Sequence, residues 1–128
     1  MRENGTGGRY SRKQKGTAAE QAAVMYLTSQ GYDIIKCNWR CRSGEIDIIA
    51  ELEGGLIFVE VRSRSGNPQQ GTPEESVNTR KIRQVRNTAE VYLHATGQEE
   101  RQVSFDVISV LLNDDTSIAA LRHIREAF

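Results

Sequence analysis

The sequence predicts an α/β fold, because helical and strand-like patterns alternate along one chain of 128 residues. Apolar residues recur at helical spacing over 17–30 and again over 76–96. The segments 44–50 and 56–62 are rich in Ile, Val and Phe, and 103–112 is similarly β-prone. The predicted order is a helix, three strands, a helix and then one or two strands, in a length that fits one domain.

The start of the chain predicts a flexible basic arm over 1–15, ahead of a single domain over 16–128. The arm is rich in Gly, Arg and Lys and has no apolar periodicity. Two roles are open for it. It contacts a phosphate backbone, or it is a solubilising terminus.

The first helix is expected from Thr17 to Gln30, with Gly31 just beyond its C-terminus. Glu20 lies on or beside the packing stripe, where a buried carboxylate needs a partner. Two interpretations are open for this residue. Thr17 and Glu20 match a capping box, or Glu20 contributes to a metal site formed farther along the chain.

A first strand is expected over Tyr32–Asn38, followed by a β-hairpin made of the two Ile- and Val-rich segments. Glu53-Gly54-Gly55 supplies the tight turn between them. Because successive strand side chains alternate faces, Ile46 and Ile48 are expected on one face and the intervening acid on the other.

The hairpin carries acids where a buried strand is normally apolar. With the turn centred between Glu53 and Gly54, Asp47 faces Glu60 and Glu45 faces Arg62, and a shift by two keeps all four on one face. Like charges directly opposite each other are destabilising, so this register needs a cation that compensates the two carboxylates. The sequence therefore favours a divalent metal at Asp47 and Glu60 over a solvated sheet face.

After the hairpin, Ser63–Glu75 contains two prolines and no periodicity, so we expect a loop that is a candidate lid over a bound substrate. A second helix is expected over Ser76–Thr96, with an apolar stripe opposite a basic face. Arg80 and Arg83 lie on that face and Lys81 on its flank. The basic face is either simply solvated or in contact with nucleic acid.

Two more strand-like segments close the chain. Val103–Leu112 is strongly β-prone and Ile118–Ile124 is a weaker apolar segment. Asp106 lies within the first of them, and we expect it to be structural rather than part of the site.

The composition fits an ordinary globular protein whose net charge is zero. Yet residues 1–48 and 62–86 carry 14 Lys or Arg against 7 Asp or Glu, so basic residues surround the acidic hairpin in sequence. A basic rim of this kind suits a polyanionic substrate. No apolar run approaches a membrane span and no signal peptide is visible, so the cytoplasm is the expected location. Cys37 and Cys41 are too few for a zinc site and are expected to be reduced thiols.

The two carboxylates suit a hard divalent cation. Mg²⁺ and Mn²⁺ prefer oxygen ligands, often one or two carboxylates with water and a substrate phosphate. Asp47 and Glu60 supply the carboxylates and the backbone carbonyl of Val61 is a candidate third oxygen. Arg62 shares their face and is suited to clamp a phosphate, but it stays protonated and is a poor general base.

This arrangement resembles the PD-(D/E)xK nuclease superfamily, with Asp47, Glu60 and Arg62 at the three signature positions. The likeness covers nearly everything after residue 15, and the motifs in order resemble the YraN-type bacterial family. They are Ala19-Glu20, Asn38-Trp39-Arg40, Gly44-Glu45-Ile46-Asp47-Ile48-Ile49-Ala50, Phe58-Val59-Glu60-Val61-Arg62-Ser63-Arg64 and Phe105-Asp106-Val107.

The resemblance implies a restriction-endonuclease-like αβββαβ core, with a mixed central sheet flanked by helices, similar to archaeal Holliday-junction resolvases. It implies that Glu20 joins the strand carboxylates at the metal and that the protein is a candidate homodimer. Two positions depart from the pattern. Ile46 stands where the signature has proline, and Arg62 stands where these nucleases usually have lysine.

Two hypotheses about function follow. The first is a Mg²⁺- or Mn²⁺-dependent DNA endonuclease, acting on branched or otherwise non-canonical DNA, with Glu20, Asp47, Glu60 and Arg62 at its catalytic site. The second is a binding module that uses a nuclease fold to recognise nucleic acid or a protein partner without cutting. In both, the residues expected to contact nucleic acid are Arg40, Arg42, Arg64, Arg80, Lys81 and Arg83.

Overall fold

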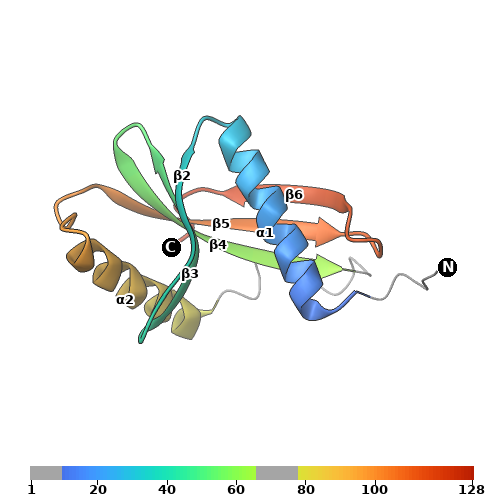
Figure 1. Cartoon of the computed structure of the whole chain (residues 1–128), viewed down its shortest axis with the longest axis horizontal. Helices are drawn as coiled ribbons and strands as arrows, with labels where there is room; N and C mark the ends of the chain where they lie inside the picture. The colour runs from blue at the N-terminus through green and yellow to red at the C-terminus, as the bar shows by residue number, and fades with distance from the viewer. Residues whose placement is uncertain (1–9, 66–77) are drawn as a thin grey trace.

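The computed structural model describes residues 10–65 and 78–128, and within them the chain forms two helices and five strands (Figure 1). Their bounds are α1 Arg12–Ser29, β2 Asp33–Cys41, β3 Gly44–Leu52, β4 Gly55–Ser65, α2 Thr79–Ala95, β5 Val103–Leu112 and β6 Ile118–Ile124. The predicted α/β class and the order of elements are confirmed. Residues 1–9 of the expected arm and 66–75 of the expected lid lie outside the described residues.

The strands form one mixed sheet in the order β2-β3-β4-β5-β6. Neighbours are antiparallel except β4 and β5, which run parallel from Leu56 beside Val103 to Ser65 beside Leu112. A parallel pair needs a long crossover connection, and α2 lies within that connection. Figure 1 shows α1 crossing the sheet in front of β4 to β6, with α2 lying beside β3.

The first helix begins at Arg12, five residues before the expected Thr17. Its N-cap is Ser11, whose side chain accepts a hydrogen bond from the Gln14 N–H at 3.1 Å, while the Gln14 side chain accepts from the Ser11 N–H at 2.8 Å. The expected capping box of Thr17 and Glu20 is therefore wrong. Ser11 and Gln14 form an equally good capping box six residues upstream, and four of the five intervening residues are good helix formers, with Gly16 as the exception.

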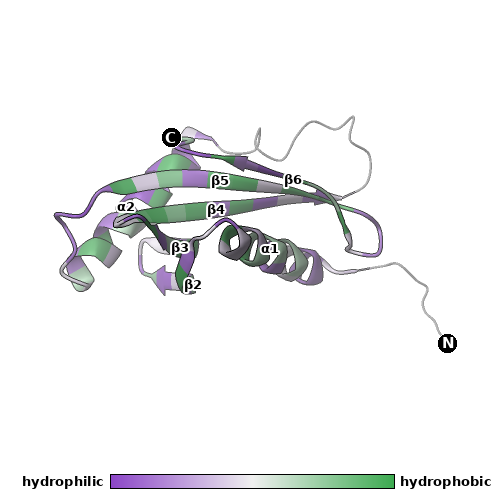
Figure 2. Ribbon diagram, turned by 90° about the horizontal axis from the view of Figure 1, so that it is seen from above, coloured by the Kyte–Doolittle hydropathy of each residue, from purple (hydrophilic) through white to green (hydrophobic). Residues whose placement is uncertain are grey.

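Each helix covers its own hydrophobic cluster. On α1, every fourth residue is buried, and these side chains pack with residues of β3, β4 and β5: Ala19, Ala23, Leu27, Ile48, Val59 and Ile108. On α2 the expected apolar stripe packs against a second cluster, which includes Val85, Ala89, Tyr92, Ile49 and Phe58. Figure 2 shows α1 stacked on one face of the sheet and apolar segments concentrated in β4 and β5.

The hairpin of β3 and β4 has the expected register from its turn to the pair of Ile48 and Val59, but the ladder ends there, so the expected pairs of Asp47 with Glu60 and of Glu45 with Arg62 are not formed. Ile48 pairs with Val59 and Leu52 with Gly55, which places Glu53 and Gly54 at the two turn positions. Their φ angles are 50° and 86°. Positive φ at both central residues is typical of a type I′ turn, whose twist matches that of the flanking strands. The predicted turn centre is confirmed.

The pairing of β3 with β4 ends at Ile48 and Val59, although both strands continue. Beyond this point, which we call the strand fork, β3 stays with β2 and β4 stays with β5. Figure 1 shows the diverging directions of the two strands. Ile48 belongs to the cluster under α1, but Ile46 belongs to the cluster under α2. The expectation that both lie on one face is wrong, because β3 turns towards α2 beyond the fork.

The second helix starts at Thr79, and the Asn78 side chain caps it by accepting a hydrogen bond from the Lys81 N–H at 2.9 Å. Its predicted start at Ser76 was three residues too early. Val103–Leu112 is a strand with the bounds expected, and the weaker segment Ile118–Ile124 forms the edge strand β6. None of the described helices is both long and apolar enough to cross a membrane.

Candidate functional site

Asp47 and Glu60 lie next to the strand fork, each one residue beyond the last pair of β3 and β4. Asp47 is partly buried, and Glu60 is only 3% exposed. Rigid strands hold both acids, since β3 still pairs with β2 and β4 with β5. Two buried carboxylates side by side are costly unless positive charge compensates them.

The pKa of Asp47 reflects its burial beside a second carboxylate. Burial, and then the neighbouring negative charge of Glu60, raise the pKa of Asp47 from 3.8 to about 7. The Val61 N–H and the charge of Lys81 act in the opposite direction. A cation between the two carboxylates would relieve the repulsion that raises this pKa.

Val61 contributes backbone atoms to the same place. Its N–H donates a hydrogen bond to Asp47 Oδ2 at 2.8 Å. In a strand, the N–H and C=O of one residue point to the same side, as the exchanged bonds of antiparallel pairs show. The Val61 carbonyl therefore faces the side on which Asp47 lies, beyond the last pair of the β3–β4 ladder.

Two cations contact Glu60 on the same oxygen. Lys81 Nζ lies 3.3 Å from Glu60 Oε2, and Arg62 Nη2 lies 3.7 Å from it. We expected Lys81 to contact nucleic acid, but not to touch a site carboxylate. No local pattern could reveal this contact, because Lys81 belongs to α2 and reaches Glu60 only through the packing of α2 beside the sheet.

Glu20 lies near these acids but is held by a different partner. Its Oε1 accepts a hydrogen bond from Asn38 Nδ2 at 3.0 Å. Burial raises the pKa of Glu20, the Asn38 hydrogen bond lowers it, and the charge of Asp47 raises it. Within residues 10–65 and 78–128, no three His, Cys, Asp or Glu side chains are grouped to hold a metal. Glu20 as a metal ligand therefore stays a prediction.

Asn38 is a residue of this region that the sequence interpretation did not single out for a role. It lies in β2 between residues paired with Ile46 and Ile48, which places it opposite Asp47. Its φ of 53° is unusual in a strand, and Asn tolerates this left-handed conformation better than most residues. A lone Asn within a β-prone segment was the only available signal.

A basic cavity of about 660 Å³ opens beside Glu60. This basic cavity, as we call it below, is lined by cationic and polar side chains. They include Arg62, Arg80, Lys81, Arg83, Asn78 and Gln84. None of the described residues that line it is acidic. Among the described residues, the buried Nε of Arg62 has no hydrogen-bond partner. Four cations that line one cavity suit a phosphate group.

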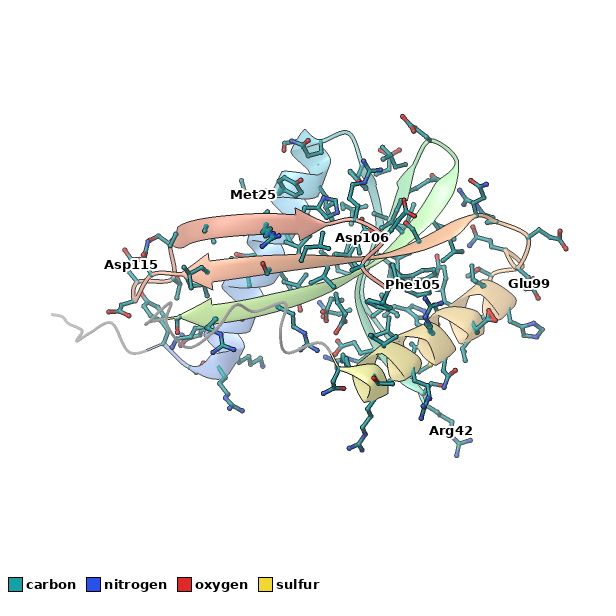
Figure 3. The ribbon with its side chains drawn as sticks, turned by 180° about the vertical axis from the view of Figure 1, so that it is seen from behind. Met25, Arg42, Glu99, Phe105, Asp106 and Asp115 are labelled. Atoms are coloured by element: carbon teal, nitrogen blue, oxygen red, sulfur yellow. The ribbon has the colours of Figure 1, made fainter. Side chains whose placement is uncertain are left out.

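The other residues expected to contact nucleic acid lie apart from the basic cavity. Arg64 lines a smaller cavity of about 250 Å³, together with Arg12 and Lys15 of α1. Arg40 is paired with Glu45 at 2.9 Å. Arg42 lies in the exposed turn between β2 and β3, and Figure 3 shows its side chain projecting outward beside α2. The structure thus brings Lys81 to Glu60 and places Arg80 and Arg83 in the lining of the basic cavity, whereas Arg40, Arg42 and Arg64 are not among its described lining residues.

The donor set at the fork fits Mg²⁺ or Mn²⁺. Two carboxylates and a backbone carbonyl are hard oxygen ligands, and Mg²⁺ usually keeps several waters in addition to one or two carboxylates. The adjacent cavity offers room for those waters and for a substrate phosphate. The neighbouring carboxylates of Asp47 and Glu60, each one residue beyond the last pair of β3 and β4, are the observation that fits added positive charge, and burial and the charge of Glu60 raise the pKa of Asp47.

Asp106 lies outside this site, as expected. Its Oδ2 contacts His123 Nε2 at 2.7 Å, its Oδ1 accepts from the Glu126 N–H at 3.0 Å, and His123 Nδ1 lies 3.1 Å from the Tyr26 hydroxyl. This buried network joins α1, β5 and the end of β6, so its role is structural (Figure 3 labels Asp106). Cys37 and Cys41 are free thiols, as expected.

Comparisons with known proteins identify relatives of this chain. Residues 19–110 match the model of "Uncharacterised protein family UPF0102". A UPF0102 protein of Persephonella marina is 44% identical over 114 residues, covering 89% of this chain and 92% of that protein. One of Desulforamulus reducens is 44% identical over 119 residues, covering 91% and 96%. One of Symbiobacterium thermophilum is 45% identical over 113 residues, covering 88% and 94%.

Proposed function

We propose that this chain, which belongs to the uncharacterised protein family UPF0102, is a metal-dependent nuclease or nuclease-like protein that acts on DNA. Family membership confirms the resemblance to the YraN-type proteins. The finer parts of the proposal are a restriction-endonuclease-like core, a Mg²⁺ or Mn²⁺ cofactor and branched DNA as substrate. A homodimer, in which two such sites would meet one branched substrate, also belongs to the proposal.

One observation carries the proposal: a pair of partly and fully buried carboxylates beside a cavity lined by cations. Asp47 and Glu60 create a place for a divalent cation, and the basic cavity creates a place for the phosphate that such a cation would polarise. The proposed sites for the cation and for the phosphate thus lie side by side. The order of elements, with three strands between two helices and then a parallel strand, supports the proposed core.

The residues divide the chemistry between them. Asp47, Glu60 and the Val61 carbonyl would hold the cation, which when bound activates water and stabilises charge on a phosphoryl oxygen. Arg62 and Lys81 would bind the non-bridging phosphate oxygens and orient the scissile bond. The Val61 N–H fixes the Asp47 carboxylate in place. Because Arg62 stays protonated, we assign it electrostatic stabilisation rather than proton transfer.

A second candidate function is binding of DNA without cleavage. Arg62 at the position of the usual lysine favours it, as does the contact of both nearby cations with Glu60. This alternative predicts salt-sensitive DNA binding through the basic cavity and no metal-dependent products.

Cleavage of labelled branched and linear DNA with Mg²⁺ or Mn²⁺ tests the proposal. We expect products from the wild type and none from Asp47→Asn or Glu60→Gln, while all three proteins still bind DNA. Glu45→Gln is the matched control, because Glu45 lies on the same strand but pairs with Arg40. Equal cleavage by all variants would refute the proposed site, and DNA binding without any products would favour the binding module.

A further inference from the structure

Glu60 is held by cations in this structure, and one of them comes from a different element. Lys81 Nζ and Arg62 Nη2 contact the same atom, Glu60 Oε2, at 3.3 and 3.7 Å. The Lys81 side chain is 30% exposed and Arg62 26%, whereas Glu60 is 3% exposed. Both cations line the basic cavity, and their charged groups contact the buried carboxylate.

The position of Lys81 is fixed at its backbone but adjustable at its ammonium group. Asn78 caps α2 and accepts the Lys81 N–H, which anchors the residue in the first turn of the helix. Four methylene groups separate this anchor from Nζ, so the ammonium group has a choice of partners within reach. Glu60 is one partner, and a phosphate in the basic cavity would be another.

We propose that Lys81 is a positioning residue that holds Glu60 in the free protein and transfers its contact to a DNA phosphate when one enters the basic cavity. This inference rests on the proposed function, because it assigns Glu60 to a metal site. Arg62, which also lines the cavity, offers the phosphate a second positive charge. When Lys81 leaves Glu60, the charge of that carboxylate is less compensated, so the carboxylate attracts a divalent cation more strongly.

The consequence is a coupling between phosphate and metal. While Lys81 contacts Glu60, its positive charge lies beside the proposed metal position and weakens binding of the divalent cation. A phosphate that attracts Lys81 removes this competition, so DNA and metal each strengthen binding of the other. Such an arrangement makes metal affinity several-fold lower without substrate than with it, while metal still binds to the free protein.

Mn²⁺ titration by calorimetry, with and without a phosphorothioate DNA duplex that resists cleavage, tests the coupling. For Lys81→Met without DNA we expect the Mn²⁺ dissociation constant to fall by about fivefold or more, the size of an ordinary coupling. The duplex should then tighten Mn²⁺ binding less in Lys81→Met than in the wild type. Lys81→Arg, which keeps the charge, should behave like the wild type.

Arg80→Met is the matched control, because Arg80 lines the same cavity, whereas among the described residues the cations that contact Glu60 are Lys81 and Arg62. It should weaken DNA binding and leave Mn²⁺ affinity without DNA unchanged. If the wild type binds Mn²⁺ and Lys81→Met binds it no more tightly, the inference is wrong while the metal site stands. If neither protein binds Mn²⁺, the proposed function fails and this inference with it. Circular dichroism of each variant establishes that it is folded.

Discussion

The backbone N–H of Val61 donates a hydrogen bond to Asp47 Oδ2 at 2.8 Å, at the place where β3 and β4 no longer pair. The Asp47 side chain thus accepts a backbone hydrogen bond just beyond the last pair of the β3–β4 ladder. This fixes the carboxylate of one strand against the backbone of the next. This arrangement brings Asp47, Glu60 and Val61 together without a loop.

Asp47→Asn should stabilise the metal-free protein at high pH. Burial and the charge of Glu60 raise the pKa of Asp47 from 3.8 to about 7, so between these values the folded state binds more protons than the unfolded state. Stability therefore falls as pH rises from about 4 to 8. Asn does not ionise, and its amide oxygen still accepts from Val61. We expect a gain on the order of 3 kcal/mol at about pH 8 and little gain near pH 4.

Urea unfolding of the wild type and Asp47→Asn in a chelating buffer, at both pH values, measures this difference. Asp33→Asn serves as a control, because Asp33 is an exposed acid of β2. A gain that is the same at both pH values would contradict the assigned cause.

Substitutions of Asn38 should separate backbone conformation from its hydrogen bond. Asn38 has a φ of 53° and donates to Glu20 at 3.0 Å. Ala loses the hydrogen bond and is poorly suited to the left-handed conformation, whereas Gly loses only the hydrogen bond. We expect Asn38→Ala to be less stable than Asn38→Gly by about 1 kcal/mol in thermal unfolding. Equal stabilities would mean that the conformation of this residue carries little strain.

Asp106→Ala should destabilise the fold without specifically affecting the site. Removal of this buried carboxylate leaves His123 and the Glu126 N–H without their partner, at a cost of about 3 kcal/mol. Asp114→Ala, at an exposed position, should change stability by less than about 0.5 kcal/mol. Denaturant unfolding gives both values. Mn²⁺ affinity, measured at a temperature where the variant is folded, should match the wild type, and a loss there would place Asp106 in the site.

The basic cavity should account for part of the salt dependence of DNA binding. Each phosphate contact contributes about 0.9 to the slope of log K against log salt concentration on duplex DNA. We expect Arg80→Met and Arg83→Met each to reduce that slope by about this amount, as measured by fluorescence anisotropy. Arg125→Met is the control, because Arg125 lines a different cavity together with Glu53 and Glu126. Equal slopes for all proteins would place the DNA elsewhere.

The hairpin was predictable because its determinants are local. Strand alternation and the Glu53-Gly54 turn are written in consecutive residues, and together they fix a register that places Asp47 and Glu60 on neighbouring positions. The long strand Val103–Leu112 was equally clear for the same reason.

Other features depended on competition or on tertiary packing. Two candidate capping boxes, Ser11 with Gln14 and Thr17 with Glu20, lie close together in the sequence, and the choice of Ser11 over Thr17 is not visible in either one alone. The turn of Ile46 towards α2 requires knowledge of the strand fork. The contact of Lys81 with Glu60 joins residues on different elements, so no spacing in the sequence could predict it.

The most direct test of the metal site is a Mn²⁺ titration by calorimetry on the wild type and on Asp47→Asn at about pH 8. At this pH, above its raised pKa, Asp47 is largely ionised, and the substitution removes one of the two carboxylates. The account predicts saturable binding by the wild type that Asp47→Asn loses. Absence of binding by the wild type, or equal binding by both proteins, would contradict the assignment of the strand fork as a metal site.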